Sequence, residues 1–204
     1  MVGLSAGSGL LVSYCGQKGA NAQIDAAVAL CPAYDIRESF KELGEESPAV
    51  EKAMLSELRR VFIKGNEEVL GAFDADALAA CEAAETLDGF MAAHAPFALG
   101  RVGANVDEYY EHSNPMNYIG GNRTPMLVLN SCDDMVCRAE NIREDLVRSH
   151  PGYALVRTAR GSHIAFNEGL LGNKCFMSRL TLDFMDAAVA SESAERPQRG
   201  RAVL

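Results

Sequence analysis

The sequence predicts an α/β fold, a mostly parallel sheet flanked by helices. Two short apolar runs, Ile24–Leu30 and Met126–Asn130, have the length and composition of buried parallel strands. The first ends at Cys31-Pro32, the second ends at a polar turn, and segments with helical periodicity lie between and after them. Strands that alternate with helices in this way form α/β sheets with right-handed crossovers.

The N-terminal segment predicts a helix that begins almost at the first residue. Apolar side chains recur at helical spacing from Ala6 to Lys18, and Gly16 and Gly19 mark the end. The preceding residues are rich in glycine and serine, and no Lys or Arg before Lys18 supplies the cationic start of a secretory signal. No window has the roughly 18–20 apolar residues that a membrane span needs. We therefore expect a cytoplasmic chain without a membrane segment.

The middle of the chain predicts a helical insert. From about Phe40 to Asp107 the sequence is rich in charged residues and has helical periodicity, without a convincing strand. We expect one α/β domain over residues 1–190 that contains this insert (40–107), followed by a disordered tail, 191–204.

Three further elements are predicted after Met126–Asn130. A helix is expected over Ala139–Ser149, and His150-Pro151-Gly152 ends it. A short strand follows at Tyr153–Thr158, and an amphipathic helix spans about Cys175–Ala190. A loop with the sequence Gly161-Ser162-His163 separates these last two elements.

Composition excludes several classes of function. Lys+Arg 19 against Asp+Glu 28 gives a net charge of −9, which argues against a nucleic-acid-binding surface. The 6 cysteines are scattered, and we expect them to be reduced and mostly buried. Cys132 and Cys137 flank two aspartates, but without neighbouring histidines a zinc site is not expected.

A dinucleotide-binding loop is not expected at the N-terminal glycines. Gly7-x-Gly9 lacks the third glycine of such a loop, because Val12 stands at that position.

Gly3-Leu4-Ser5-Ala6-Gly7 matches G-x-S-x-G, the sharp turn that exposes a nucleophilic serine between a strand and a helix. We expect both glycines to be required, because a Cβ at either flank would collide across so tight a turn. The helix pattern begins directly after Ser5, as this turn demands. The backbone N–H of Ala6 is then a candidate oxyanion donor.

A nucleophilic serine needs a histidine to accept its proton and a carboxylate to orient that histidine. His163 is the candidate base, since it lies in a loop after the last predicted strand. His94 and His112 belong to the insert, and His150 lies at a helix C-terminus, where the helix dipole explains it. The acid should follow Met126–Asn130, where Asp133 and Asp134 are both available.

Three segments carry a resemblance to a known family: GLSAGSGLLVSYCGQKG, VDEYYEHSNPMNYIGGNRTPMLVLNSCDDMVC and ARGSHIAFNEG. Together they resemble the YheT-like branch of the α/β-hydrolases, which includes abhydrolase domain-containing proteins one to three. The resemblance places the nucleophile on Ser5, the base on His163 and the acid on Asp134, the second aspartate of the turn. Asp133 is then a turn-stabilising or neighbouring charge. Ser162-His163 replaces the family's Gly-His pair.

The resemblance implies a serine hydrolase that cleaves carboxylic esters or lipids, among them phospholipids and medium-chain acyl esters, with no metal or organic cofactor. The insert would be a lid over the acyl pocket. Its apolar residues would either line that pocket or pack within the lid, which is the commoner role. These residues are Phe62, Leu70, Phe73, Phe90, Met91 and Phe97.

The family places several strands before the serine turn, whereas only Met1 and Val2 precede Gly3 here. We therefore expect the C-terminal part of an α/β-hydrolase fold, without the N-terminal strands and without the loop that supplies the second oxyanion donor. A longer form would then carry the missing strands and, as in eukaryotic relatives, an upstream membrane anchor. The alternative is a catalytically inactive remnant that binds a protein partner through its open sheet edge.

Overall fold

A computed structural model describes the backbone of residues 1–199 and the side chains of residues 1–191. The chain forms two compact units. The sheet unit comprises Met1–Tyr34 and the chain from Pro115 onward, and the helical unit comprises Asp35–Asn114. The expected tail, 191–204, falls partly outside the described residues, because only its backbone up to Arg199 is described.

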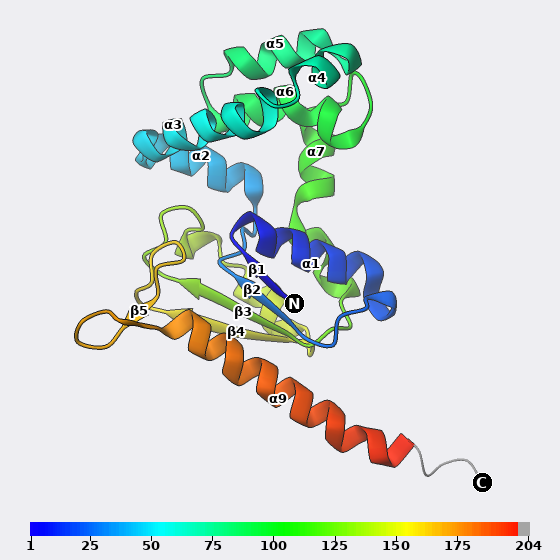
Figure 1. Ribbon diagram of the computed structural model, residues 1–204, viewed down its shortest axis with the longest axis vertical. Helices are drawn as coiled ribbons and strands as arrows, with labels where there is room; N and C mark the ends of the chain where they lie inside the picture. Colours follow the sequence, from blue (N-terminus) through cyan, green and yellow to red (C-terminus); the bar gives the residue numbers. More distant parts are fainter. Residues whose placement is uncertain (200–204) are drawn as a thin grey trace. The chain divides into compact units, whose positions relative to one another are not determined.

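The sheet unit contains a four-stranded sheet in which every neighbouring pair is parallel. Its strands, in their order across the sheet, are β1 (Val2–Leu4), β2 (Ala27–Leu30), β3 (Met126–Ser131) and β4 (Tyr153–Thr158) (Figure 1). Leu4 is in register with Leu30, and Leu30 with Leu129. The carboxyl ends of the strands therefore meet at one edge, which is where ligand sites form in such sheets.

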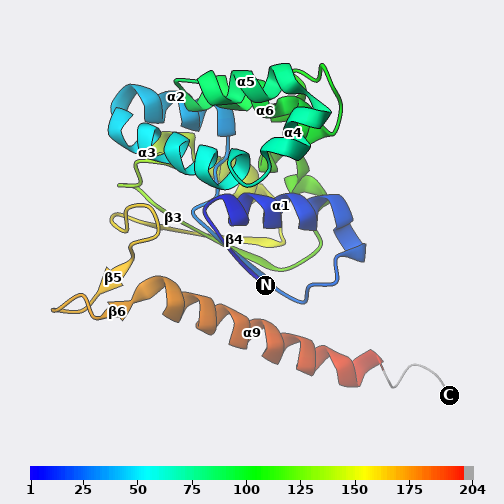
Figure 2. The same cartoon turned by 45° about the horizontal axis from the view of Figure 1, so that its top comes forward.

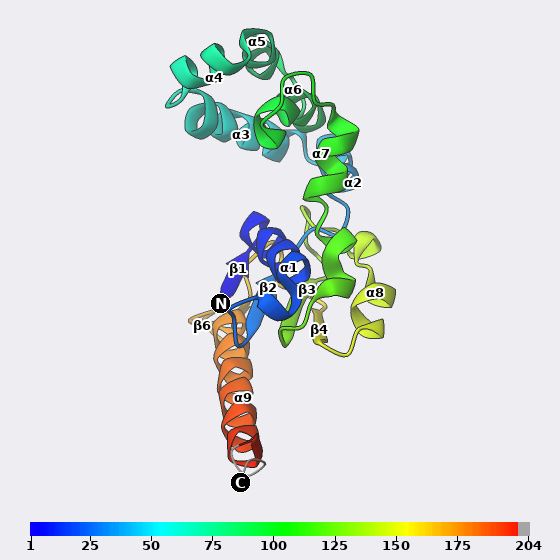
Figure 3. The same ribbon diagram turned by 90° about the vertical axis from the view of Figure 1, so that its right-hand side faces the viewer.

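Helices cover both faces of this sheet, as predicted (Figures 2 and 3). In β2, Ala27 and Ala29 pack toward α1, and Val28 and Leu30 pack toward the opposite face. The first face is covered by α1 (Ala6–Lys18), the 3₁₀ helix η3 (Pro115–Gly121) and α8 (Glu144–Ser149). The second is covered by the start of α9 (Phe176–Arg199). Burial on both faces explains why the strands are continuously apolar.

Helix α1 approaches η3 closely because Gly16 has no side chain. A Cβ at Gly16 would lie 2.1 Å from the carbonyl oxygen of Tyr118, a separation that real atoms do not reach. Just beyond Gly16, α1 ends at Gly19, which has a φ of 52°. Gly16 is therefore a packing residue as well as part of the predicted end of the helix.

The structure of the sheet unit differs from the prediction in several elements. The strand predicted from Ile24 begins at Ala27. The helix predicted over 139–149 is split, because the extended backbone of Ile142 separates the 3₁₀ helix η4 (Ala139–Asn141) from α8. The last helix, predicted to end at Ala190, continues to Arg199. A small antiparallel pair, β5 (Asn167–Glu168) with β6 (Lys174–Cys175), was not predicted.

The helical unit begins earlier and ends later than the predicted insert, 40–107. It contains α2 (Ile36–Glu46), α3 (Pro48–Leu58), the π-helix η2 (Arg59–Ile63), α4 (Glu67–Phe73), α5 (Ala75–Ala83), α6 (Leu87–Leu99) and α7 (Val106–Ser113). Side chains of Asp35, Asp74, Thr86 and Asn105 cap four of these helices. Arg37 in α2 pairs with Asp107 in α7 at 2.7 Å, which joins the first and last helices of the unit.

Aromatic side chains form the interior of the helical unit. The Phe62 ring lies 6.3 Å from Phe90 and 6.0 Å from Phe97, measured between centroids. His94 joins them, 4.7 Å from Phe62, and burial lowers the pKa of its imidazole. These insert residues thus pack against one another, and a role for them in lining an acyl pocket stays a prediction.

Among the described residues, no helix is both long enough and apolar enough to cross a membrane.

Candidate active site

Ser5 occupies the turn between β1 and α1. Its backbone has φ 49° and ψ −123°, a combination that is sterically unfavourable for any residue with a Cβ. The Ser5 N–H donates a 2.9 Å hydrogen bond to the carbonyl oxygen of Leu30 at the end of β2, which ties the turn to the sheet. This is the strained strand-to-helix geometry that the G-x-S-x-G pattern predicts.

The two glycines of the pattern are not equivalent. A Cβ on Gly3 would stand 2.5 Å from the Gly7 carbonyl oxygen and 2.7 Å from the Cα of Ser8. Apart from its chain neighbours and the backbone of its own helix, a Cβ on Gly7 would meet no described atom within 4 Å. The expectation that both positions require glycine is therefore wrong for Gly7, because its Cα faces outward from the first turn of α1.

The hydroxyl of Ser5 does not cap α1, although Ser5 occupies the N-cap position. A serine there commonly accepts a hydrogen bond from a backbone N–H in the first turn. Ser5 makes no such bond, and the Ser8 hydroxyl instead donates to the Ser5 carbonyl oxygen at 2.5 Å. The left-handed φ turns the Ser5 side chain away from the helix end.

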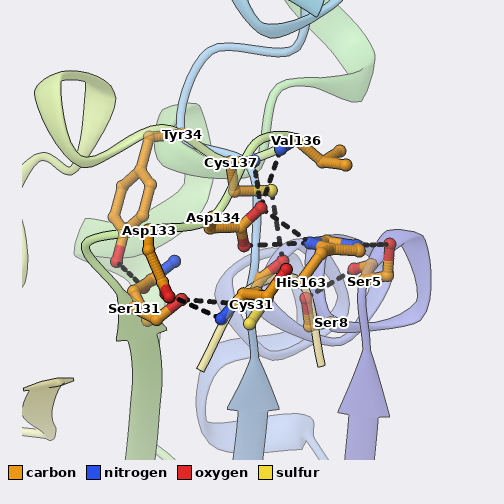
Figure 4. A network of polar contacts seen from close by, with 12 residues as sticks. Ser5, Ser8, Cys31, Tyr34, Ser131, Asp133, Asp134, Val136, Cys137 and His163 are labelled. Carbon is orange, nitrogen blue, oxygen red and sulfur yellow. Dashed lines mark hydrogen bonds and ion pairs between the residues drawn. The ribbon is translucent and has the colours of Figure 1, made fainter. Parts of the chain in front are cut away.

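The Ser5 side chain points instead toward His163 (Figure 4). His163 Nε2 lies 2.7 Å from Ser5 Oγ. The histidine comes from the segment between β4 and β5, and its side chain is 17% exposed. The structure therefore brings together the candidate nucleophile and the candidate base.

Asp134 lies on the other side of the imidazole ring. Its Oδ2 is 2.9 Å from His163 Nδ1, and its Oδ1 accepts hydrogen bonds from the backbone N–H groups of Val136 and Cys137. The side chain is fully buried. An ionised carboxylate only accepts hydrogen bonds, so the proton of a neutral His163 is placed on Nδ1, and Nε2 is free to accept one from Ser5.

Asp133 contacts the backbone of the loop that carries His163, not the imidazole ring. Its Oδ1 accepts a 2.7 Å hydrogen bond from the Ser162 N–H. That bond is the main reason why the pKa of the exposed Asp133 carboxyl is lowered. The two adjacent aspartates therefore have different partners: Asp133 bonds to the Ser162 backbone, and Asp134 contacts the imidazole.

Cys31, at the end of β2, is a neighbour of this site that the sequence did not indicate. It adopts a φ of 52°, and its sulfur lies among ligand atoms of Asp134 and His163 that are all within 4.8 Å of one another. Such a cluster could hold a metal ion. Burial, however, raises the pKa of the Cys31 thiol to about 12, and both Asp134 oxygens already accept hydrogen bonds. These groups satisfy one another without an ion.

The remaining histidines lie elsewhere. His150 caps α8, and its Nδ1 accepts a hydrogen bond from the Gly152 N–H at 3.1 Å. His94 and His112 belong to α6 and α7 of the helical unit. Ala6 is exposed as the first residue of α1, where helix geometry leaves its N–H without an intrahelical acceptor.

Comparisons with known proteins show distant relatives of this chain. No family model matches the chain. It is 34% identical over 85 residues to the mouse phospholipase ABHD3, a match that covers 41% of this chain and 21% of that protein. It is 26% identical over 175 residues to the embryogenesis-associated protein EMB8 of Picea glauca, covering 82% of this chain and 37% of that protein.

A solved structure, an acylaminoacyl peptidase bound to a chloromethyl ketone, shares the fold with a TM-score of 0.51 and 13% sequence identity. The match covers 91% of this chain and 23% of the peptidase. The chain therefore has the α/β-hydrolase fold. Its sequence is distantly homologous to ABHD3 and EMB8, of the YheT-like branch of the α/β-hydrolases.

The chain spans only part of these relatives, about a fifth of ABHD3 and 37% of EMB8, so both are longer proteins.

Proposed function

We propose that the protein is a serine hydrolase of carboxylic esters, in which Ser5 is the nucleophile, His163 the general base and Asp134 the residue that orients the base. One observation carries the proposal. Ser5 does not form the usual capping hydrogen bond, and its backbone conformation is unfavourable. Its hydroxyl oxygen lies 2.7 Å from His163 Nε2. A serine with only a structural role at a helix N-terminus would cap the helix.

The contacts define the path of the proton. As Ser5 Oγ attacks the ester carbonyl carbon, its proton passes to His163 Nε2, and the carboxylate of Asp134 stabilises the imidazolium. The imidazolium then protonates the departing alkoxide, which leaves an acyl group on Ser5 Oγ. Water attacks this acyl-enzyme, again with His163 as base, and regenerates the serine. We assign the Ala6 N–H as a donor to the oxyanion in both steps.

A lipid or acyl ester substrate is the finer part of the proposal. It is supported by the distant homology to ABHD3, whose name describes a phospholipase. The helical unit, with its aromatic interior, is proposed as the lid of the acyl pocket.

Labelling with a fluorophosphonate probe tests the proposal, because such probes react with activated serines. We expect the protein to be labelled at Ser5 and Ser5→Ala to remain unlabelled. Ser13→Ala, a serine of the same helix without a role in the site, is the matched control and should label normally. Labelling that persists in Ser5→Ala would refute the assignment of the nucleophile.

A second candidate function, a protein-binding module, is favoured by one feature of the sheet. In the described structure β1 pairs only with β2, and Val2 and Leu4 on it are each 43% exposed. Unpaired apolar strand edges are sites of strand addition. Probe labelling of wild type at Ser5 would count against an inactive remnant.

A further inference from the structure

His163 stands between two residues with left-handed backbones. Ser162 has a φ of 48°, and Ile164 has a φ of 62°. A β-branched residue such as isoleucine rarely adopts this conformation, so the loop is strained on both sides of the base. Strain of this kind persists only where surrounding contacts impose it.

Two hydrogen bonds at Ser162 hold the strained backbone on the N-terminal side of His163. Asp133 Oδ1 accepts the Ser162 N–H at 2.7 Å, and the Ser131 hydroxyl donates to the Ser162 carbonyl oxygen at 2.7 Å. These bonds hold the peptide groups on either side of the Ser162 Cα, and the second of those groups carries the nitrogen of His163. The direction of the His163 side chain is thereby constrained through the backbone.

Other contacts anchor the same loop. Phe166 is buried against the sheet, and its ring lies where a Cβ of Gly161 would stand. The Ala165 N–H donates to the Gly161 carbonyl oxygen at 2.9 Å, and that carbonyl belongs to the peptide group that also carries the Ser162 N–H. Asp133 and Ala165 therefore hold the first peptide group at Ser162 together, and Ser131 holds the second.

Asp133 does not form a simple local turn. An aspartate in a turn usually accepts a hydrogen bond from its own backbone about two residues on. Asp134 does so with Val136, whereas Asp133 bonds to Ser162, 29 residues away. Two carboxylates from the turn after β3 therefore contact different groups of the loop that carries His163.

We infer that Asp133 and Ser131 are positioning residues, which act through Ser162 to hold His163 Nε2 against Ser5. Asp134 orients the imidazole ring, and Asp133 and Ser131 orient the backbone that carries it. The inference rests on the proposed function, since it assigns a role in the same reaction. It also implies that the hydrogen bond to Ser162, not the charge of Asp133, is what the base requires.

Four variants separate these effects. Asp133→Ala removes the acceptor, whereas Asp133→Asn keeps an acceptor oxygen and removes the charge. Ser131→Ala removes the bond to the Ser162 carbonyl oxygen, together with the smaller hydrogen-bond contribution of the Ser131 side chain to the Asp133 carboxyl. Asp145→Ala is the matched control, because Asp145 is an exposed aspartate of α8 that pairs with Arg143, and no contact links it to the loop. Each variant is compared with wild type by fluorophosphonate labelling rate and by hydrolysis of a short p-nitrophenyl ester.

We expect Asp133→Ala to lower the labelling rate and kcat about tenfold to hundredfold with KM unchanged, because a small misplacement of a base lowers the rate on that scale. Asp133→Asn should recover most of the rate, Ser131→Ala should fall between them, and Asp145→Ala should match wild type. A purely structural role would not give rescue by asparagine together with an unchanged KM.

The outcomes are distinguishable from failure of the proposed function. Wild type that is not labelled at Ser5 would refute the proposed function. Wild type that is labelled at Ser5, with Asp133→Ala reacting within twofold of it, would refute only the inference made here. Equal losses in Asp133→Ala and Asp133→Asn would also refute it, since the charge would then be the cause. If Asp133→Ala does not fold, a normal rate in Ser131→Ala overturns the role of the Ser162 contacts.

Discussion

The Cα of Gly3 lies against the backbone of Gly7, so that a Cβ on Gly3 would stand 2.5 Å from the Gly7 carbonyl oxygen. Relief of such a contact requires the backbone of β1 or α1 to move. We therefore expect Gly3→Ala to destabilise the protein by about 1–3 kcal/mol and to displace Ser5. The midpoint of thermal unfolding and the rate of probe labelling should both fall.

Gly7→Ala is the matched substitution at the other glycine of the pattern. Space around Gly7 is open in the described structure, and alanine favours a helix over glycine by up to about 1 kcal/mol. Stability should stay constant or rise, and labelling at Ser5 should continue. A loss as large as that of Gly3→Ala would show that Gly7 contacts something outside the described residues.

Ser162→Gly should stabilise the protein. A left-handed residue with a Cβ costs about 1–2 kcal/mol, which glycine avoids, and the greater freedom of glycine in the unfolded chain offsets about 0.4–1 kcal/mol of this gain. The net increase in the free energy of unfolding is expected to be up to about 1.6 kcal/mol in chemical denaturation. Both Ser162 bonds use its backbone, so probe labelling should persist. Ser13→Gly, inside α1, should instead destabilise.

The bond between Asp133 and Ser162 predicts a pH dependence at acidic pH. The Ser162 N–H lowers the pKa of the folded carboxyl below its ordinary value of 3.8. A depressed folded pKa means that the added stabilisation from the ionised carboxylate is present above the ordinary value and is lost as pH falls through the folded one, although a carboxyl oxygen can still accept the Ser162 N–H. The amide resonance of Ser162, followed by NMR, should therefore titrate below 3.8. Asp133→Asn should show no such titration, and an unchanged wild-type resonance would argue against the bond.

The cysteines should fall into two classes of reactivity. Cys132 is exposed, and hydrogen bonds from Ser178 lower the pKa of the partly exposed Cys175. Burial raises the pKa of Cys81 to about 11 and that of Cys31 to about 12, and Cys15 and Cys137 are also buried with raised pKa values. We expect iodoacetamide at about pH 8 to alkylate the first two and spare the other four in the native protein.

Mass spectrometry of peptides identifies the modified positions, and all 6 cysteines should react once the chain is unfolded in urea. Rapid native modification of Cys31 would contradict its burial beside Asp134. It would also show that the loop of His163 opens readily.

Elements with a strong local pattern were predictable. The helix Ala6–Lys18 and the strand Tyr153–Thr158 were predicted to the residue, because uninterrupted periodicity or apolar character and nearby glycines define their ends. The β5–β6 pair has two residues in each strand, too few to show a period. The break at Ile142 interrupts a segment whose composition remains compatible with a helix.

The site residues also differ in how far local sequence predicts them. Ser5 and His163 lie in short motifs that carry their own turn chemistry, so local sequence was enough to nominate them. Asp133 and Asp134 have different partners because of how the turn after β3 faces a loop 29 residues away. No local sequence pattern specifies that arrangement. Cys31 was missed because a cysteine with φ 52° has no signal of the kind that glycine would give.

The pairing of Arg37 with Asp107 bears on how the chain folds. β2 and β3 are neighbours in the sheet but are separated along the chain by the whole helical unit, and the entropy lost on closing a loop grows with its length. Helix contacts within that unit are local and form quickly. When α2 and α7 associate, the first and last helices of the unit lie together. The flexible connection that must close before β2 can pair with β3 is then effectively short. Early folding of the helices would thus accelerate assembly of the sheet.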